Sequence, residues 1–304
     1  MPINKKPRNE SIEDKKPMSF YISEPLYRFE DLILDKGVID EIRQTIALEK
    51  YGDLIYEKWG LKNVIKQKRN ISINLFGASG TGKTMTAHAI ANELHKKILL
   101  VNYAEIESKY VGETSKNLIR LFEYAKEKGV LIAFDEADAL LSKRVTAMSS
   151  ATDVSVNQTR NVLLRILDDY SGVVVFTTNF IKNYDKAFLR RITSHIKIDV
   201  PNRELRKELW KHYLVSSLPI VGDRDEIADR LAGTDNITGA DISTVVLKAA
   251  VNIAVNEEKG LDIDLLDMEL QKIVEAKKAM DNRNEFQVTT RKVSEEYVKE
   301  QEVI

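Results

Sequence analysis

The sequence predicts an α/β fold in which helices cover both faces of a parallel sheet, followed by a smaller domain made only of helices. Up to residue 200, short and nearly continuous apolar segments alternate with segments of helical spacing. This alternation is typical of a parallel sheet that is buried on both faces. After Pro201 the strand-like segments stop, while helical spacing continues to about residue 280. We therefore expect a large domain over residues 26–200 and a helical domain over residues 201–280.

The expected elements follow one another in order along the chain. Ile39, Ile42, Ile46 and Leu48 lie at near-helical spacing before the first apolar segment. Apolar segments of four to six residues then predict strands at 71–76, 98–101, 130–134, 173–176 and 196–200. Helices are expected at 85–95, at 118–126, around 162–167, and then at 204–215, 225–231, 239–255 and 261–280.

The composition limits the classes of function. Of the 304 residues, 43% are hydrophobic and 31% charged, which is typical of a globular protein with a substantial core. The 46 Lys and Arg residues are balanced by 47 Asp and Glu residues, so no basic excess favours nucleic-acid binding. The absence of cysteine excludes disulfides, thiolate catalysis and Cys-ligated zinc. No apolar segment approaches the roughly 20 residues that span a bilayer, and no secretory signal is visible, so we expect a cytoplasmic protein.

Both ends of the chain contain little apolar material. Residues 1–25 include Pro2, Pro7, Pro17 and Pro25 and several lysines, and we expect a flexible leader there. Such a leader is either simply solvated or a docking arm for a partner. Residues 281–304 form a charged tail, with a short helix expected from Ser294.

A glycine-rich segment with the pattern G-x-x-x-x-G-K-[ST] follows the first expected strand. Its glycines allow the backbone to turn so that successive N–H groups point at a phosphate, and the next helix offers its positive N-terminus to the same anion. The lysine supplies a charge for the β- and γ-phosphates, and the last hydroxyl ligates Mg²⁺. The motif therefore predicts an ATP and Mg²⁺ site formed by Gly77, Ala78, Ser79, Gly80, Thr81, Gly82, Lys83, Thr84 and the adjoining Met85.

Two carboxylates end the third expected strand. Asp135 and Glu136 follow the apolar segment 130–134 directly. Adjacent acids at the end of a buried strand are costly unless a cation or water meets them. Beside a bound Mg-nucleotide, Asp135 would hold the Mg²⁺ shell and Glu136 would polarise the attacking water. Without the glycine-rich segment, the same pair would be interpreted as a helix N-cap.

Asn179 follows the fourth expected strand. An amide side chain at this strand end would reach the γ-phosphate or the attacking water. The alternative, an asparagine that caps a turn, is the more common role of such a residue taken alone.

The order of these three motifs resembles the AAA module of the P-loop NTPases, and three further segments agree with it. Residues 238–242, with Gly239 and Ala240, are similar to the small-residue turn of the AAA lid. Residues 185–191, which end in Arg190 and Arg191, are similar to the segment that carries arginine fingers. The segment 108–114 resembles the pore loop of protein-remodelling members, with Lys109, Tyr110, Val111 and Gly112. The resemblance covers residues 29–280, and within the family the chain resembles single-module protein-remodelling members such as katanin and spastin.

The resemblance implies a three-layer sandwich with sheet order 5-1-4-3-2, a helical lid, and a homo-oligomeric, usually hexameric, ring that acts on a protein substrate. It assigns Lys83, Thr84, Asp135 and Glu136 to nucleotide, Mg²⁺ and water, and Asn179 to the γ-phosphate.

Two roles outside the chain's own nucleotide site are implied as well. Arg190 and Arg191 would reach the neighbouring subunit's ATP, where a guanidinium stabilises transition-state charge. Without the resemblance they would be interpreted as partners of a helix dipole. Tyr110, otherwise an ordinary half-buried surface residue, would grip an extended peptide by aromatic contact.

The chain also departs from the family pattern. Many members have a lid histidine that touches the nucleotide, whereas the corresponding position here is Tyr213, next to His212. The base contacts of the nucleotide therefore stay open. His88, His95, His195 and His212 form no H-E-x-x-H pattern, so a fused zinc protease is absent.

Three functions remain open on the sequence. The first is an ATPase that remodels proteins. The second is a DNA-linked loader or initiator, for which we would expect basic DNA-reading elements that are not evident. The third is a nucleotide-dependent regulatory switch, against which the intact Glu136 argues because a pure switch needs no catalytic base.

Overall fold

The computed structural model describes residues 20–65, 70–102, 106, 113–142, 151–179, 184–256 and 260–284. The chain divides into two compact units, Met1–Pro201 and Asn202–Ile304. Each unit has its own hydrophobic core. The expected leader up to residue 19, the pore-loop residues 109–112 and the expected helix from Ser294 lie outside the described residues.

The first unit is built on one six-stranded sheet with the order β1-β3-β4-β5-β2-β6. The strands are β1 (Ile22–Ser23), β2 (Ile71–Phe76), β3 (Ile98–Asn102), β4 (Leu131–Asp135), β5 (Val173–Thr178) and β6 (Ser194–Lys197). Strands β2 to β6 pair in parallel. When these five strands are counted by themselves, their order is the expected 5-1-4-3-2, which confirms the predicted α/β fold.

Two details of the sheet differ from the expectation. The strand expected at 196–200 is β6, and it lies at Ser194–Lys197 because its register is set by β2, which ends at Phe76 opposite Lys197. The second difference is β1, which pairs antiparallel with Ile98 and Leu99 at the sheet edge. Residues 22 and 23 thus belong to the sheet and not to the leader.

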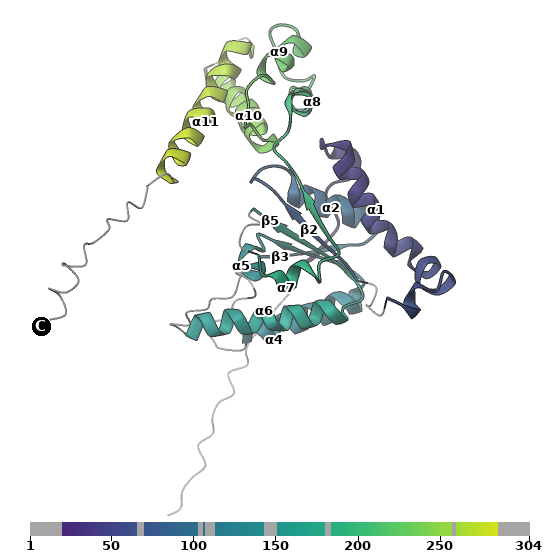
Figure 1. The fold of residues 1–304 in the computed structure, drawn as a ribbon. Helices are drawn as coiled ribbons and strands as arrows, with labels where there is room; N and C mark the ends of the chain where they lie inside the picture. Colours follow the sequence, from purple (N-terminus) through teal and green to yellow (C-terminus); the bar gives the residue numbers. More distant parts are fainter. Residues whose placement is uncertain are drawn as a thin grey trace, which may run out of the picture. The chain divides into compact units, whose positions relative to one another are not determined.

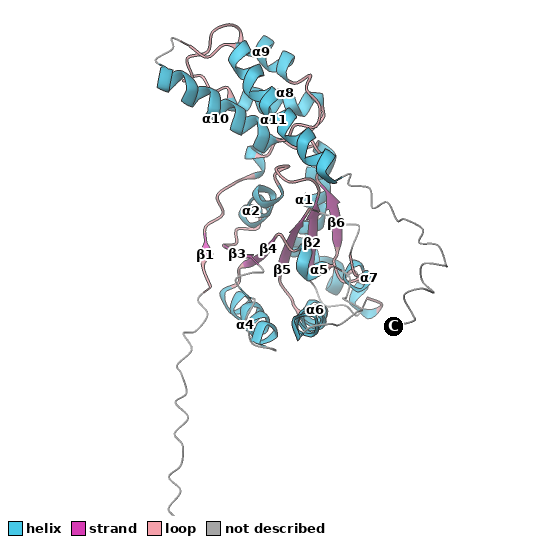
Figure 2. Ribbon diagram, turned by 90° about the vertical axis from the view of Figure 1, so that its left-hand side faces the viewer, coloured by secondary structure: helices cyan, strands magenta, loops and turns pink. Residues whose placement is uncertain are grey.

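Helices cover both faces of the sheet (Figures 1 and 2). One layer contains α1 (Lys36–Gly52) and α2 (Lys83–Glu93), and the other contains α4 (Glu113–Lys128) and α6 (Ala151–Asp169). Alternate strand residues face opposite layers, as the two-residue period of a strand requires. On β4, Leu131 and Ala133 pack with the α1–α2 core, whereas Ile132 and Phe134 pack with the α4–α6 core.

Among the described residues of the first unit, five short helical turns connect these layers. They are η1 (Phe29–Asp31), η2 (Asp53–Lys58), η3 (Leu61–Asn63), α5 (Asp138–Leu141) and α7 (Lys186–Leu189). Both α1 and α7 begin at an aspartate, since Asp35 accepts a hydrogen bond from Gly37 N at 2.8 Å and Asp185 from Ala187 N at 2.9 Å. Aspartate is among the residues preferred at this position because it satisfies an otherwise free backbone N–H group.

The second unit is made of helices around the fully buried Trp210. The helices are α8 (Arg203–Tyr213), α9 (Arg224–Leu231), α10 (Gly239–Asn256) and α11 (Ile263–Asn284). They agree with the helices expected from the sequence to within a few residues at each end. Within the described part of the chain, no helix has the length and apolar character needed to cross a membrane.

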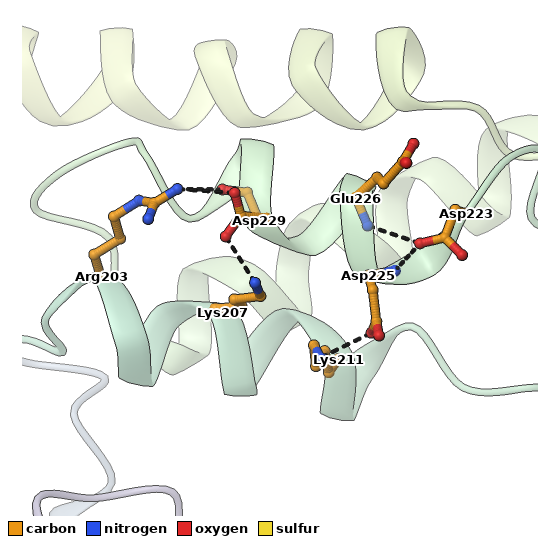
Figure 3. A network of polar contacts seen from close by, with 7 residues as sticks. All are labelled: Arg203, Lys207, Lys211, Asp223, Asp225, Glu226 and Asp229. Carbon is orange, nitrogen blue, oxygen red and sulfur yellow. Dashed lines mark hydrogen bonds and ion pairs between the residues drawn. The ribbon is translucent and has the colours of Figure 1, made fainter.

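Ion pairs join α8 to α9 on the surface of this unit (Figure 3). Asp229 accepts from Arg203 at 3.0 Å and from Lys207 at 2.8 Å. One turn further along α8, Lys211 lies 2.8 Å from Asp225. The basic face of α8 is therefore matched by the acidic face of α9.

Candidate functional site

The glycine-rich loop between β2 and α2 has a backbone that requires glycine. Gly77 has a φ of +153°, and a Cβ atom there would lie 2.0 Å from the carbonyl oxygen of Ile198. Gly80 and Gly82 have φ values of +79° and +96°. Residues with a side chain rarely adopt these angles. The loop also closes on itself, because the Thr81 hydroxyl donates to the Ala78 carbonyl at 2.9 Å.

Helix α2 begins directly at this loop with no side chain capping its first turn. Its N-cap is Gly82, and the first helical hydrogen bond runs from Thr86 N to the Gly82 carbonyl at 2.9 Å. The backbone N–H groups of the first turn of a helix have no intrahelical partner, and the helix dipole is positive there. Together these features form an anion-binding site of the kind that receives phosphate.

Lys83 is buried at the centre of the site. Its Nζ donates to the carbonyl oxygens of Gly77 at 2.9 Å and Ala78 at 2.8 Å, and to Oδ1 of Asn179 at 2.9 Å. Burial lowers the pKa of the Lys83 ammonium, while the nearby charges of Asp135, Asp138 and Glu136 oppose that shift. The structure thus brings together the loop lysine and the asparagine from the end of β5, as the sequence predicts.

The end of β4 supplies the second half of the site. The Thr84 hydroxyl donates to Oδ1 of Asp135 at 3.0 Å, and the Thr177 hydroxyl also donates to this oxygen. Thr84 and Asp135 are therefore adjacent, although 51 residues separate them in the chain. A hydroxyl and one carboxylate beside a phosphate site fit Mg²⁺, which prefers oxygen ligands and keeps several waters and phosphate oxygens. Among the described residues no three or more His, Cys, Asp or Glu side chains gather as a metal cluster, and such a Mg²⁺ site does not need one.

Glu136 adopts a strained backbone conformation. Its φ is +52°, in the left-handed region that non-glycine residues seldom occupy. The conformation is held by a hydrogen bond from Glu136 N to the Thr177 hydroxyl at 3.1 Å. Its side chain is exposed, while the preceding strand is buried. Strain of this kind persists where the surroundings fix it and is frequent at active sites.

Asp138 and Thr177 are members of the site that the sequence analysis did not single out. Asp138 begins α5, and its two carboxylate oxygens accept the backbone N–H of Asn179, each at 3.2 Å. Thr177 contacts both Asp135 and Glu136 through its hydroxyl. In the sequence, Asp138 could have been found as a further acid soon after Asp135. Thr177 could have been found as a hydroxyl residue near the end of an otherwise apolar strand.

The two arginines after α7 differ in their surroundings. Arg191 Nε lies 2.9 Å from a carboxylate oxygen of Asp168, and Nη1 donates to the Ala187 carbonyl at 3.3 Å. Arg190 is exposed, and its side chain makes no ion pair or hydrogen bond within the described residues. Of these two arginines, Arg190 is the one that is exposed and has no anchoring side-chain contact within the described part of the chain.

The lid residues lie in the second unit at the start of α10. Gly239 and Ala240 follow Thr238, whose backbone N–H donates to Asp241 at 2.7 Å and so orders the first turn. Tyr213, at the position of the family's lid histidine, packs edge-on against His212 with ring centroids 5.1 Å apart. The proposed contacts of these residues with a nucleotide stay predictions.

The glycine loop, the helix N-terminus, the buried lysine and the acid pair at the end of β4 define the nucleotide site of a P-loop protein. Residues 73–200 match the model of the ATPase family associated with various cellular activities, AAA. Residues 73–200 therefore form an AAA ATPase domain, as the resemblance implied.

Similar proteins carry the same domain. The chain is 31% identical to the proteasome-activating nucleotidase of Methanothermobacter thermautotrophicus, over 73% of this chain and 53% of that protein. It is 33% identical to the ATPase family gene 2 protein of Schizosaccharomyces pombe, over 62% and 24%. Identity to the proteasome-associated ATPase of Nakamurella multipartita is 29%, over 72% and 42%. The chain thus matches about half the length of the archaeal nucleotidase, and the narrower likeness to katanin and spastin stays a prediction.

Proposed function

We propose that this protein hydrolyses Mg-ATP in a homo-oligomeric ring and uses the energy to remodel a protein substrate. The observation that carries the proposal is the partly buried cluster in which Lys83, Thr84, Asp135 and Asn179 meet at the ends of neighbouring strands. Phosphates bound at the α2 N-terminus would accept hydrogen bonds from Lys83 in place of the loop carbonyls. Mg²⁺ would bind between Thr84, Asp135 and the phosphates.

The residues then divide the hydrolysis between them. Glu136 is exposed next to the metal site, where a carboxylate polarises the attacking water. Asn179 is held by Asp138 and Lys83, so its amide is positioned to contact the γ-phosphate or that water. Among the described residues, no arginine contacts Lys83, Asp135 or Asn179. We assign the arginine at the γ-phosphate to Arg190 of a neighbouring copy.

Protein remodelling is favoured over the DNA-linked alternative. The relatives described above include proteins named for activating or associating with a proteasome. The chain has no excess of basic residues. The proposed grip on the substrate is Tyr110 in segment 109–112, where an aromatic ring would contact any extended peptide with little demand on its sequence.

A mixing experiment tests the ring. A subunit with Arg190→Ala and Arg191→Ala keeps its ATP site, and a Lys83→Ala subunit keeps its arginines. Each variant alone should be inactive, and mixing them should restore part of the ATPase activity because some interfaces then pair an intact site with intact arginines. The parent's turnover per chain should rise with protein concentration. Specific activity that is independent of concentration, with no restoration on mixing, would favour a monomeric enzyme.

Tyr110→Ala tests remodelling separately from hydrolysis. Basal ATPase activity should stay within a few-fold of the parent, while substrate-stimulated activity is lost. Tyr110→Phe and Tyr110→Trp are the matched controls and should keep most of the stimulation, because the contact needs a flat ring. Normal substrate processing by Tyr110→Ala would contradict pore threading. A Glu136→Gln variant that stalls on its substrate would identify the substrate by pull-down.

A further inference from the structure

A buried tyrosine connects the site to the segment that carries the arginines. Tyr184 is 5% exposed, and its hydroxyl donates to the Thr178 hydroxyl at 2.9 Å. Burial raises the pKa of the Tyr184 phenol well above its ordinary value, so the group remains a hydrogen-bond donor throughout the physiological range. The backbone of Tyr184 also forms an antiparallel bridge with Ser142, just after α5.

Thr178 lies between two residues of the nucleotide site. On one side Thr177 donates to Asp135, and on the other Asn179 accepts from Lys83. The Thr178 hydroxyl accepts from Tyr184 and donates in turn to Oδ1 of Asn74 at 3.3 Å. Asn74 is on β2, three residues before the glycine loop begins. The contacts therefore run from the arginine segment through the end of β5 to the strand that leads into the loop.

These polar groups lie in an apolar environment. The ring of Tyr184 belongs to the same core cluster as Phe176, Phe188 and Ile192. Asn74 Nδ2 has no hydrogen-bond partner within the described residues. A buried hydroxyl or amide costs free energy unless its hydrogen bonds are made, and an apolar side chain of the same shape avoids that cost. Packing alone would thus be served by phenylalanine at position 184 and leucine at position 74.

We propose that Tyr184 is a positioning residue for ATP hydrolysis, an inference that rests on the proposed function. Its hydroxyl holds Thr178 and thereby sets the positions of Thr177 and Asn179 against Asp135 and Lys83. Tyr184 also directly precedes Asp185, the N-cap of α7, and Arg190 directly follows that helix. The same hydrogen bond therefore ties the γ-phosphate contact of one site to the arginine that serves the neighbouring site.

Tyr184→Phe tests this role because it removes one oxygen and keeps the ring. Tyr170→Phe is the matched control. Tyr170 is 6% exposed in the same core cluster, contacts Phe122 edge-on, and precedes β5 at the end opposite Thr178. No hydrogen bond of its hydroxyl is found within the described residues. For each variant we would measure kcat for ATP, the Kd of a fluorescent ATP analogue, and the melting temperature.

A positioning role predicts a fall in kcat for Tyr184→Phe of about fivefold or more, the size expected when one buried hydrogen bond at the site is lost. The Kd should be unchanged, and Tyr170→Phe should keep the parent's kcat. A merely structural role would lower the melting temperature and leave kcat unaltered, which would overturn the inference.

A double-mutant cycle with Thr178 sharpens the test. Thr178→Val should cause the same loss of kcat, the double variant no further loss, and Thr178→Ser should retain activity. Additive losses would show that the two hydroxyls act independently and would contradict the inference. An unmodified protein that neither binds nor hydrolyses ATP would contradict the proposed function itself, whereas an active parent matched by Tyr184→Phe would overturn this inference only.

Discussion

Two clusters of charged residues in the molecule differ in their burial and in how the fold brings their members together. In the nucleotide site, hydrogen bonds join residues 51 and 96 positions apart, and Lys83 is only 8% exposed. On the helical unit, Asp229 pairs with residues 22 and 26 positions away, and the side chains of Lys207 and Asp229 are 37% and 43% exposed (Figure 3). The first cluster surrounds a buried lysine and is assembled by the sheet, while the second lies on the surface between consecutive helices.

This difference in burial determines what each cluster contributes to stability and to function. Solvent and salt screen the α8–α9 pairs, and each contributes little to the free energy of unfolding. Burial makes the charge of Lys83 costly, and a bound Mg-phosphate group would place opposite charges beside Lys83 and Asp135. The buried Lys83, next to Asn179 and near Asp135, therefore marks the candidate nucleotide site.

The largest effect is expected from Glu136→Gln. The substitution keeps the shape of the side chain but removes the base, so kcat should fall by on the order of 10² to 10⁴. ATP affinity should persist because the phosphate contacts remain. Glu127→Gln, at an exposed position near the end of α4, is the control and should hydrolyse ATP at the parent's rate. Equal turnover by Glu136→Gln would exclude this residue as the base.

Lys83→Ala should act mainly on binding. It removes the phosphate charge, and ATP affinity measured by calorimetry should fall at least about tenfold, or about 1.4 kcal/mol. Lys207→Ala, which removes a lysine from the exposed cluster, should leave the affinity unchanged. Equal ATP affinity of the two variants would show that Lys83 contributes no more to ATP binding than the exposed Lys207.

The smallest effect is expected from Asp229→Asn. It breaks both ion pairs to α8, and the melting temperature should fall by no more than a few degrees because the pairs are exposed. The difference from the parent should shrink further at high salt. A large loss of stability, or of ATP turnover, would show that the surface cluster does more than we assign to it.

Much of the fold follows from local sequence patterns. Strands β2 to β5 are short apolar segments, and their ends were predicted to within about two residues. The displacement of β6 came from its partner, since β2 ends at Phe76 while the apolar pattern of residues 196–200 continues. Strand β1 is two residues long and carries too little pattern to be recognised.

In the site, too, some residues were predicted from the sequence and others were not. The glycine loop, Asp135 and Glu136 were predicted because their spacing carries a mechanism, and Asn179 was predicted through the resemblance to the AAA module. Asp138 and Tyr184 were missed because their roles depend on contacts across the sheet, with Asn179 and Thr178 respectively. A sequence pattern shows which residue types are present, but only the fold shows which hydroxyl lies beside which strand end.

Release of phosphate from ATP by the unmodified protein, with Mg²⁺ and with a chelator, tests the central claim most directly. If the cluster of Lys83, Thr84, Asp135 and Asn179 is a Mg-ATP site, phosphate release should be continuous with Mg²⁺ and should stop when the ion is chelated. The Lys83→Ala variant should stay at the background rate under both conditions. Release that is independent of Mg²⁺, or that is equal in the parent and Lys83→Ala, would contradict the assignment.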